Sequence, residues 1–230
     1  MLMYHHVGDW GPSNAGWSDW VVRPAEFAKQ LDWLKENGYR TITFRELRAA
    51  ADRGVAADPR SVIISFDDGW AEAYHWIRAE LEPRGMKAVL FVFTGAVAAN
   101  RNGGGYISWE ELHELEASGH EVQSHTVSHP ALAGLPPAML ARELAESRRV
   151  IEQQTLHPAE ALAYPFGSFD RAELEAAHAA GYRIALRAEA DPAVAATAPL
   201  AYPRIRVGYD DPIEVFADRI RSGFTPRSLR

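Results

Sequence analysis

The chain has 230 residues and a formal net charge of −7, and its length suits a single α/β barrel with one core. An acidic chain without a basic stripe argues against nucleic acid as a partner, because phosphate binding needs clustered lysine and arginine. The chain contains no cysteine, which excludes disulfides, thiolate metal ligands and a cysteine nucleophile. We therefore expect any metal ion to be held by histidine and carboxylate side chains.

The sequence pattern gives no membrane span. The longest apolar run, 88–93, is far shorter than the roughly 20 residues that a transmembrane helix needs. The first residues also lack the basic and apolar regions of a secretory signal peptide. We expect either a cytoplasmic protein or an exported domain whose signal has been removed.

Short apolar runs, several of them unbroken, alternate with segments of helical periodicity, and unbroken runs are typical of parallel strands covered on both faces. This repeated alternation predicts one domain over residues 1–230, a single distorted (β/α)7–8 barrel with parallel strands. Two irregular stretches, 8–22 and 100–106, are candidate binding loops. In chain order the predicted elements are strand 2–5, helix 24–36, strands 40–44, 61–66 and 88–93, helix 109–117, strand 121–124, helix 136–153, strand 161–164, helix 171–180, strands 183–186 and 204–207, and helix 212–220.

Several helix boundaries are marked by residues that favour them. Pro24 suits the first turn of a helix, and Asn37-Gly38 ends that helix. Ser108 and Glu111 have the spacing of a capping box at the start of helix 109–117. These signals place the helices between the strands, as a barrel requires.

Polar side chains follow four of the predicted strands, where a barrel carries its active site. Asp67-Asp68 follow strand 61–66, His125 follows strand 121–124, and His5-His6 end the first strand. The segment 164–167, Tyr-Pro-Phe-Gly, follows the strand near 161. We expect these strand ends to meet on one face of the barrel.

The pair Asp67-Asp68 has two interpretations. Asp-Gly is turn-forming, so the pair and Gly69 form either a solvated turn or part of a site. Two carboxylates at the rim of a core repel each other unless a cation intervenes. The preceding apolar strand therefore favours the functional interpretation.

His125 and His129 are four residues apart, a spacing that allows two imidazoles on one side of a helical turn to bind one ion. The alternative is a pair of hydrogen-bonded loop residues. Together with Asp68 they offer three ligands and leave coordination positions open, as in hydrolytic zinc sites. Asp67 is then free to act as a general base.

The remaining candidates have weaker patterns. Of His5 and His6 we expect at most one to be catalytic, because neighbours on a strand point to opposite faces. Tyr164 and Pro165 form either a turn or part of the substrate site, in which a backbone N–H near Phe166 binds an oxyanion. Three tryptophans lie in the irregular stretch 8–22: Trp10, Trp17 and Trp20. They can pack together as part of a lid or stack on sugar rings.

With these motifs the chain resembles the polysaccharide deacetylase family, carbohydrate esterase family 4, from Leu2 to about Phe224. The matching segments are 65–69 (SFDDG), 125–129 (HTVSH) and 163–167 (AYPFG). The resemblance implies a (β/α)7-type barrel and Zn²⁺, or another divalent ion such as Co²⁺, Ni²⁺ or Fe²⁺, bound by Asp68, His125 and His129. It also implies that Asp67 is the base in hydrolysis of N-acetyl groups on an N-acetylglucosamine-containing glycan.

The chain departs from the family pattern at two places. The third motif of the family opens with an arginine that orients the base, whereas here Ala163 stands in its place; Arg204 is the candidate to reach over from another strand end. The late Leu-x-His motif, which carries the general acid, is also missing. The branch acting on poly-N-acetylglucosamine is similar in carrying this motif at the N-terminus. This likeness implies that His5 is the acid and that His6 is either a bystander or a residue that contacts the catalytic groups without touching substrate.

Two alternatives remain from the sequence. The same site can act on a small non-sugar amide or cyclic imide. Alternatively, the barrel binds glycan without catalysis, for which the departures at Ala163 and the missing late histidine are the support. Intact Asp67, Asp68, His125 and His129 speak for the enzyme.

Overall fold

Seven parallel strands form the main sheet of the structure, a computed structural model that describes residues 1–9, 20–100, 105–188, 200–208 and 211–222. All neighbouring strands in this sheet run parallel. Their spatial order is β10 (Ile184–Leu186), β9 (Ala161–Ala163), β8 (Glu121–Ser124), β7 (Val89–Val92), β6 (Ile64–Phe66), β1 (Leu2–Tyr4) and β11 (Ile205–Arg206).

The first and last strands of the main sheet along the chain, β1 and β11, are neighbours in space, as in a barrel. Leu2 is in register with Ile64 on one side and Ile205 on the other. The edge strands β10 and β11 are connected through Tyr202, which forms a parallel bridge with Leu186. The predicted parallel barrel is confirmed, with seven strands in its main sheet.

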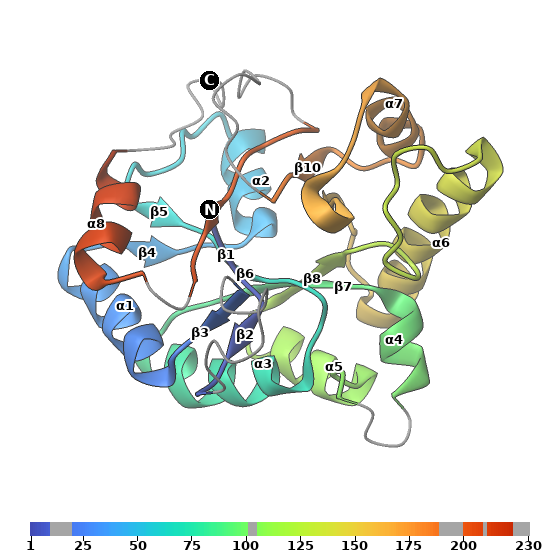
Figure 1. Ribbon diagram of the computed structural model, residues 1–230. Helices are drawn as coiled ribbons and strands as arrows, with labels where there is room; N and C mark the ends of the chain where they lie inside the picture. The colour runs from blue at the N-terminus through green and yellow to red at the C-terminus, as the bar shows by residue number, and fades with distance from the viewer. Residues whose placement is uncertain (10–19, 101–104, 189–199, 209–210, 223–230) are drawn as a thin grey trace.

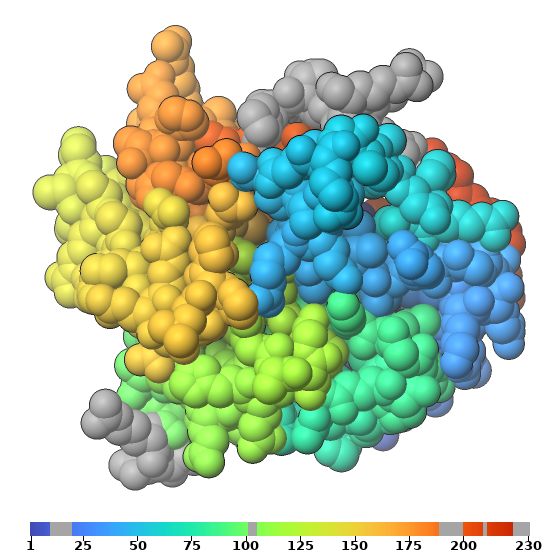
Figure 2. Space-filling view, turned by 180° about the vertical axis from the view of Figure 1, so that it is seen from behind, coloured from blue at the N-terminus to red at the C-terminus, as the bar shows by residue number. Residues whose placement is uncertain are grey.

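Helices surround the strands in Figure 1 and cover the outer face of the curled sheet. Seen from behind, α2 lies between the α6–α7 side and α1 (Figure 2). The helices are α1 (Pro24–Glu36), α2 (Phe44–Asp52), α3 (Ala71–Trp76), α4 (Thr94–Ala99), α5 (Trp109–Ala117), α6 (Pro137–Thr155), α7 (Arg171–Ala179) and α8 (Ile213–Arg221).

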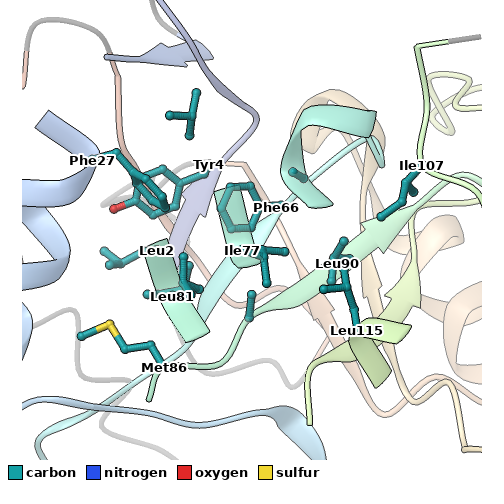
Figure 3. Packing of buried hydrophobic residues seen from close by; sticks show 14 of the residues in the cluster. Leu2, Tyr4, Phe27, Phe66, Ile77, Leu81, Met86, Leu90, Ile107 and Leu115 are labelled. Carbon is teal, nitrogen blue, oxygen red and sulfur yellow. The ribbon is translucent and has the colours of Figure 1, made fainter. Parts of the chain in front are cut away.

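Alternation along β7 divides the core into an inner and an outer part. Val89 and Phe91 pack in one cluster with residues such as Ala163, whereas Leu90 and Val92 pack in another that includes helix residues. Successive strand residues point to opposite faces, and here both faces are buried. The larger cluster is formed by β1, β6 and β7 with the helices beside them (Figure 3).

Two of the predicted strands differ most from expectation, whereas the others agree to within one residue at each end. Strand 61–66 is divided into β5 (Ser61–Val62) and β6, and β5 pairs with β4 (Arg40–Thr41) in a separate two-stranded sheet. Strand 40–44 ends early because Thr43 caps α2, with Glu46 completing a capping box. The sequence prediction missed this helix, although the Thr-x-x-Glu spacing is its signal.

A second two-stranded sheet lies beside the carboxyl end of β1. It pairs β2 (His6–Val7) with β3 (Val21–Val22). Among the described helices, none combines the length and apolar character needed to cross a bilayer.

Candidate active site

Three potential metal ligands meet at the carboxyl ends of β6 and β8. Asp68 Oδ1 lies 3.4 Å from His125 Nε2 and 3.3 Å from His129 Nε2. The two imidazole nitrogens are 3.1 Å apart. One ligand atom from each residue thus lies within 4.8 Å of the others, so one ion can contact all three.

The donor set fits a divalent cation. His125 Nδ1 donates to the carbonyl oxygen of Ala163 at 2.7 Å, so in the neutral ring Nε2 keeps its lone pair and faces the site. Asp68 Oδ1 is buried and makes no hydrogen bond of normal geometry with the described residues. Its other oxygen, Oδ2, accepts from the indole Nε1 of Trp70 at 3.1 Å. Electron-rich atoms therefore converge where a cation would stabilise them.

The pKa values of these groups respond to the same crowding. Burial by itself would raise the pKa of Asp68, but His125 and His129 hold it well below its ordinary value. Burial would likewise lower the pKa of His125, yet the carboxylates of Asp68 and Asp67 raise it. The cluster thus attracts positive charge.

The two histidines lie on an irregular loop, and the predicted helical turn is wrong. Thr126 has a φ of 75° and His129 a φ of 59°, both in the left-handed region. The loop is irregular because its polar backbone groups bond to side chains: Thr126 N donates to Ser124 Oγ, and His129 N to Thr126 Oγ1, each at 3.1 Å.

Asp67 lies beside this cluster and forms a buried ion pair with Arg204. Arg204 Nη1 donates to Asp67 Oδ1 at 2.7 Å, and Nη2 to Oδ2 at 2.6 Å. Arg204 also donates to Ser65 Oγ at 3.3 Å and to the carbonyl of Arg187 at 3.2 Å, and its guanidinium lies over the ring of Phe91. Arg204, directly before β11, thus reaches Asp67 from another strand end.

This pair sets the charge of Asp67. Burial is the largest influence and would raise the pKa of Asp67, but Arg204 and, to a smaller extent, His125 hold it below its ordinary value. The carboxylate is therefore ionised at neutral pH and fixed in orientation, as a base must be.

His5 and His6 both line the same cavity, because the chain leaves the β1 ladder at His5 and β2 begins at His6. The imidazole of His5 packs at 4.5 Å from the Trp20 ring. Burial lowers the pKa of His5 to about 4, although Asp67 and Asp68 oppose the shift. His6 is buried and its Nδ1 lies 2.5 Å from Glu72 Oε1. Because the His6 ring contacts Glu72, His5 is the histidine that is better placed to contact substrate.

The turn after β9 adds aromatic surface to the cavity. Phe166 has a φ of 58° and is 70% exposed, and its ring lies 4.8 Å from that of His129. Tyr164 is buried, and its hydroxyl donates to the carbonyl of Leu200 at 3.1 Å. Both line the cavity, whereas Pro165 is a buried part of the turn outside its lining.

The cavity has a volume of about 610 Å³, which suits a small ligand or one sugar unit of a longer chain. Trp20 lines it, while Trp10 and Trp17 lie outside the described residues. The predicted site residues that line it together are His5, His6, Trp20, Asp67, Asp68, His125, His129, Tyr164, Phe166 and Arg204.

Sequence reasoning missed two aromatic residues of the cavity that are linked to Asp68. Trp70 stacks on Tyr106 with ring centroids 4.7 Å apart, and the two residues form an antiparallel bridge. The signal for Trp70 was its place directly after Asp67-Asp68-Gly69. Tyr106 ends the candidate binding loop 100–106, but nothing in the sequence singled out this residue, because the bridge to Trp70 brings it to the site.

The chain matches the model of a known protein family over more than half of its length. The family model described as polysaccharide deacetylase matches residues 54–185. The match includes Asp67, Asp68, His125 and His129 and ends before Arg204.

Individual relatives extend the likeness over most of the chain. YxkH of Bacillus subtilis (strain 168), named as a polysaccharide deacetylase, is 27% identical over 207 residues, 90% of this chain and 70% of that protein. A poly-beta-1,6-N-acetyl-D-glucosamine N-deacetylase of Staphylococcus aureus (strain MSSA476) is 25% identical over 202 residues, 84% of this chain and 69% of that protein.

A solved structure agrees with the fold. The Streptococcus pyogenes deacetylase PplD, in complex with acetate, superposes with a TM-score of 0.85 at 25% identity. The superposition covers 95% of this chain and 96% of that one, so the barrel and its main connections are shared.

Proposed function

The chain belongs to the polysaccharide deacetylase family, and from that premise we propose that it is a metal-dependent hydrolase removing N-acetyl groups from N-acetylglucosamine-containing polysaccharide or oligosaccharide. One observation carries the proposal: an ionised, arginine-held carboxylate, Asp67, shares a cavity with the Asp68, His125 and His129 cluster. The name of the Staphylococcus aureus relative supports the choice of sugar.

Asp68, His125 and His129 would hold the metal, for which Zn²⁺ is the first choice and Co²⁺, Ni²⁺ or Fe²⁺ are alternatives. Two imidazoles and one carboxylate form a ligand set typical of catalytic zinc. Bound there, the ion would supply Lewis acidity that polarises the acetamide carbonyl and lowers the pKa of water.

Asp67 is the proposed general base, which accepts a proton from water as the water attacks the acetyl carbon. Arg204 binds both carboxylate oxygens, so it fixes their direction and keeps the group ionised. A base positioned in this way contributes typically about 10²–10⁴-fold to the rate.

His5 is the proposed general acid toward the departing amine nitrogen. Its lowered pKa leaves the imidazole neutral at pH 7, and a neutral ring cannot serve as the acid. His5 must therefore gain its proton within the reaction cycle, and the proton released from water is the available source. In the overall reaction, water adds across the C–N bond of the acetamide and gives acetic acid and the free amine.

The aromatic residues of the cavity are proposed to hold the sugar. Trp20, Tyr164 and Phe166 offer ring faces or edges, and Pro165 shapes their turn. A backbone N–H near Phe166 is proposed to bind the oxyanion. Trp10 and Trp17 stay candidates for the same surface.

The proposal is tested by acetate release from β-1,6-linked N-acetylglucosamine oligomers of increasing length, with parallel assays on a panel of small linear and cyclic amides. We expect chelator-sensitive release that rises with oligomer length. Release from the small amides alone would favour the alternative substrate class, and binding of oligomers without any release would favour a catalytically silent barrel.

A further inference from the structure

A single carboxylate on α6 holds the loop that carries the two histidines. Glu143 Oε2 accepts from the backbone N–H groups of Val127 and Ser128, both at 2.9 Å. Its Oε1 accepts from the hydroxyl of Ser128 at 2.6 Å. One side chain thus accepts three hydrogen bonds from Val127 and Ser128, which lie between His125 and His129 in the chain.

The loop needs such a restraint because its backbone is strained. Thr126 and His129 both have positive φ, which is uncommon outside glycine and especially unfavourable for a β-branched residue such as threonine. Without Glu143 the two loop N–H groups turn to solvent, and the loop gains freedom to leave this conformation.

Two carbonyl groups of the loop are held by the start of α4. Thr94 N donates to the carbonyl of Thr126 at 3.1 Å, and Gly95 N donates to that of Val127 at 2.8 Å. A Cβ at Gly95 would lie 2.7 Å from the Val127 oxygen, so only glycine permits this approach. The loop is therefore clamped between α4 and α6.

One turn further along α6, Ser147 supports the same loop through Ser124. Its hydroxyl accepts from Ser124 Oγ at 2.9 Å, and Ser124 Oγ in turn accepts from the N–H of Thr126 at 3.1 Å. Glu143 and Ser147 are four residues apart and share one face of the helix. That face of α6 therefore holds the loop both at Val127-Ser128 and, through Ser124, at Thr126.

We propose that Glu143 is a positioning residue that fixes the 125–129 loop in its metal-binding conformation and thereby sets the affinity for the metal. The inference rests on the proposed metal site. Groups that orient metal ligands from outside the coordination shell typically change metal affinity by about 10–100-fold when they are removed.

The test measures zinc affinity of the folded protein by competition with a chromophoric chelator, and it needs no substrate. We expect Glu143→Ala to weaken zinc binding by about 10–100-fold. Glu143→Gln should recover most of the loss, because its amide oxygen can still accept both backbone N–H groups while its NH₂ donates to the Ser128 hydroxyl. Glu146→Gln is the matched control on the same helix, since Glu146 pairs with Arg142; its affinity should equal that of the unmodified protein.

Urea unfolding of the metal-free variants distinguishes positioning from general support of the fold. Loss of stability in Glu143→Ala with unchanged zinc affinity would overturn the proposal. A Glu143→Gln variant as weak as Glu143→Ala would also overturn it, because the hydrogen-bond geometry would then not be the cause. Failure of the unmodified protein to bind zinc would instead refute the metal site itself, and this inference with it.

Discussion

Replacing Arg204 by methionine should expose how strongly the fold depends on the Asp67–Arg204 pair. The two side chains are 2% and 1% exposed and share two hydrogen bonds of 2.7 Å and 2.6 Å. Arg204→Met keeps an unbranched apolar side chain but removes the guanidinium, so it leaves the carboxylate of Asp67 buried without its partner. Breaking a buried pair in this way costs about 3–5 kcal/mol.

The pH dependence of this loss follows from the pKa of Asp67. In the unmodified protein Arg204 keeps that pKa below its ordinary value, near 4 in an unfolded chain. Asp67 then adds stability above about pH 4, and this stability disappears as the pH falls through the folded-state pKa. In the variant, burial is no longer opposed by Arg204, so the pKa of Asp67 rises and the folded state gains from protonating this carboxylate. The difference in unfolding free energy should therefore be full at pH 7 and shrink toward acidic pH.

Urea unfolding of metal-free protein at pH 7 and pH 5, followed by circular dichroism, measures both effects. Arg142→Met is the control, because this exposed arginine pairs at the surface, where pairs contribute about 0–1 kcal/mol. Adding Asp67→Asn to Arg204→Met should restore part of the stability by removing the buried charge. The reasoning is refuted if Arg204→Met costs no more than the control, or if its deficit is independent of pH.

Four single substitutions test the assigned roles. Asp67→Asn should retain the metal and lose about 10²–10⁴-fold in rate; near-normal turnover would remove it as the base. His125→Ala should lose the metal in a binding assay, and unchanged metal content would contradict its assignment as a ligand. His5→Ala should lower kcat more than His6→Ala does in steady-state assays, whereas the reverse order would move the acid to His6.

The barrel was predictable because most of its strands are short apolar runs that end in polar residues. Asp67 and Asp68 follow such a run, and His125 follows the predicted strand 121–124, so their meeting at one face followed from the parallel sheet alone. Strand boundaries were less predictable. Thr43 lies in a segment whose composition favours a strand, yet its hydroxyl caps α2. The strand β4 therefore ends at Thr41, two residues before Thr43.

Long-range side-chain partners were the part that the sequence did not determine. Arg204 lies 137 positions from Asp67, and only the register of β11 beside β1 brings it to the carboxylate. Glu143 lies on a predicted amphipathic helix, where an acidic residue ordinarily indicates a solvated face. Its contact with Val127 and Ser128 depends on the left-handed backbone of the loop, which no local pattern revealed.

Metal-dependent deacetylation is tested most directly by titrating metal-free protein with zinc while acetate release from an N-acetylglucosamine oligomer is recorded. We expect activity to rise linearly and to saturate at a single equivalent of zinc, and His125→Ala to stay inactive throughout. Activity that persists in the chelated protein, or that does not follow zinc occupancy, would contradict the claim that this cluster drives deacetylation.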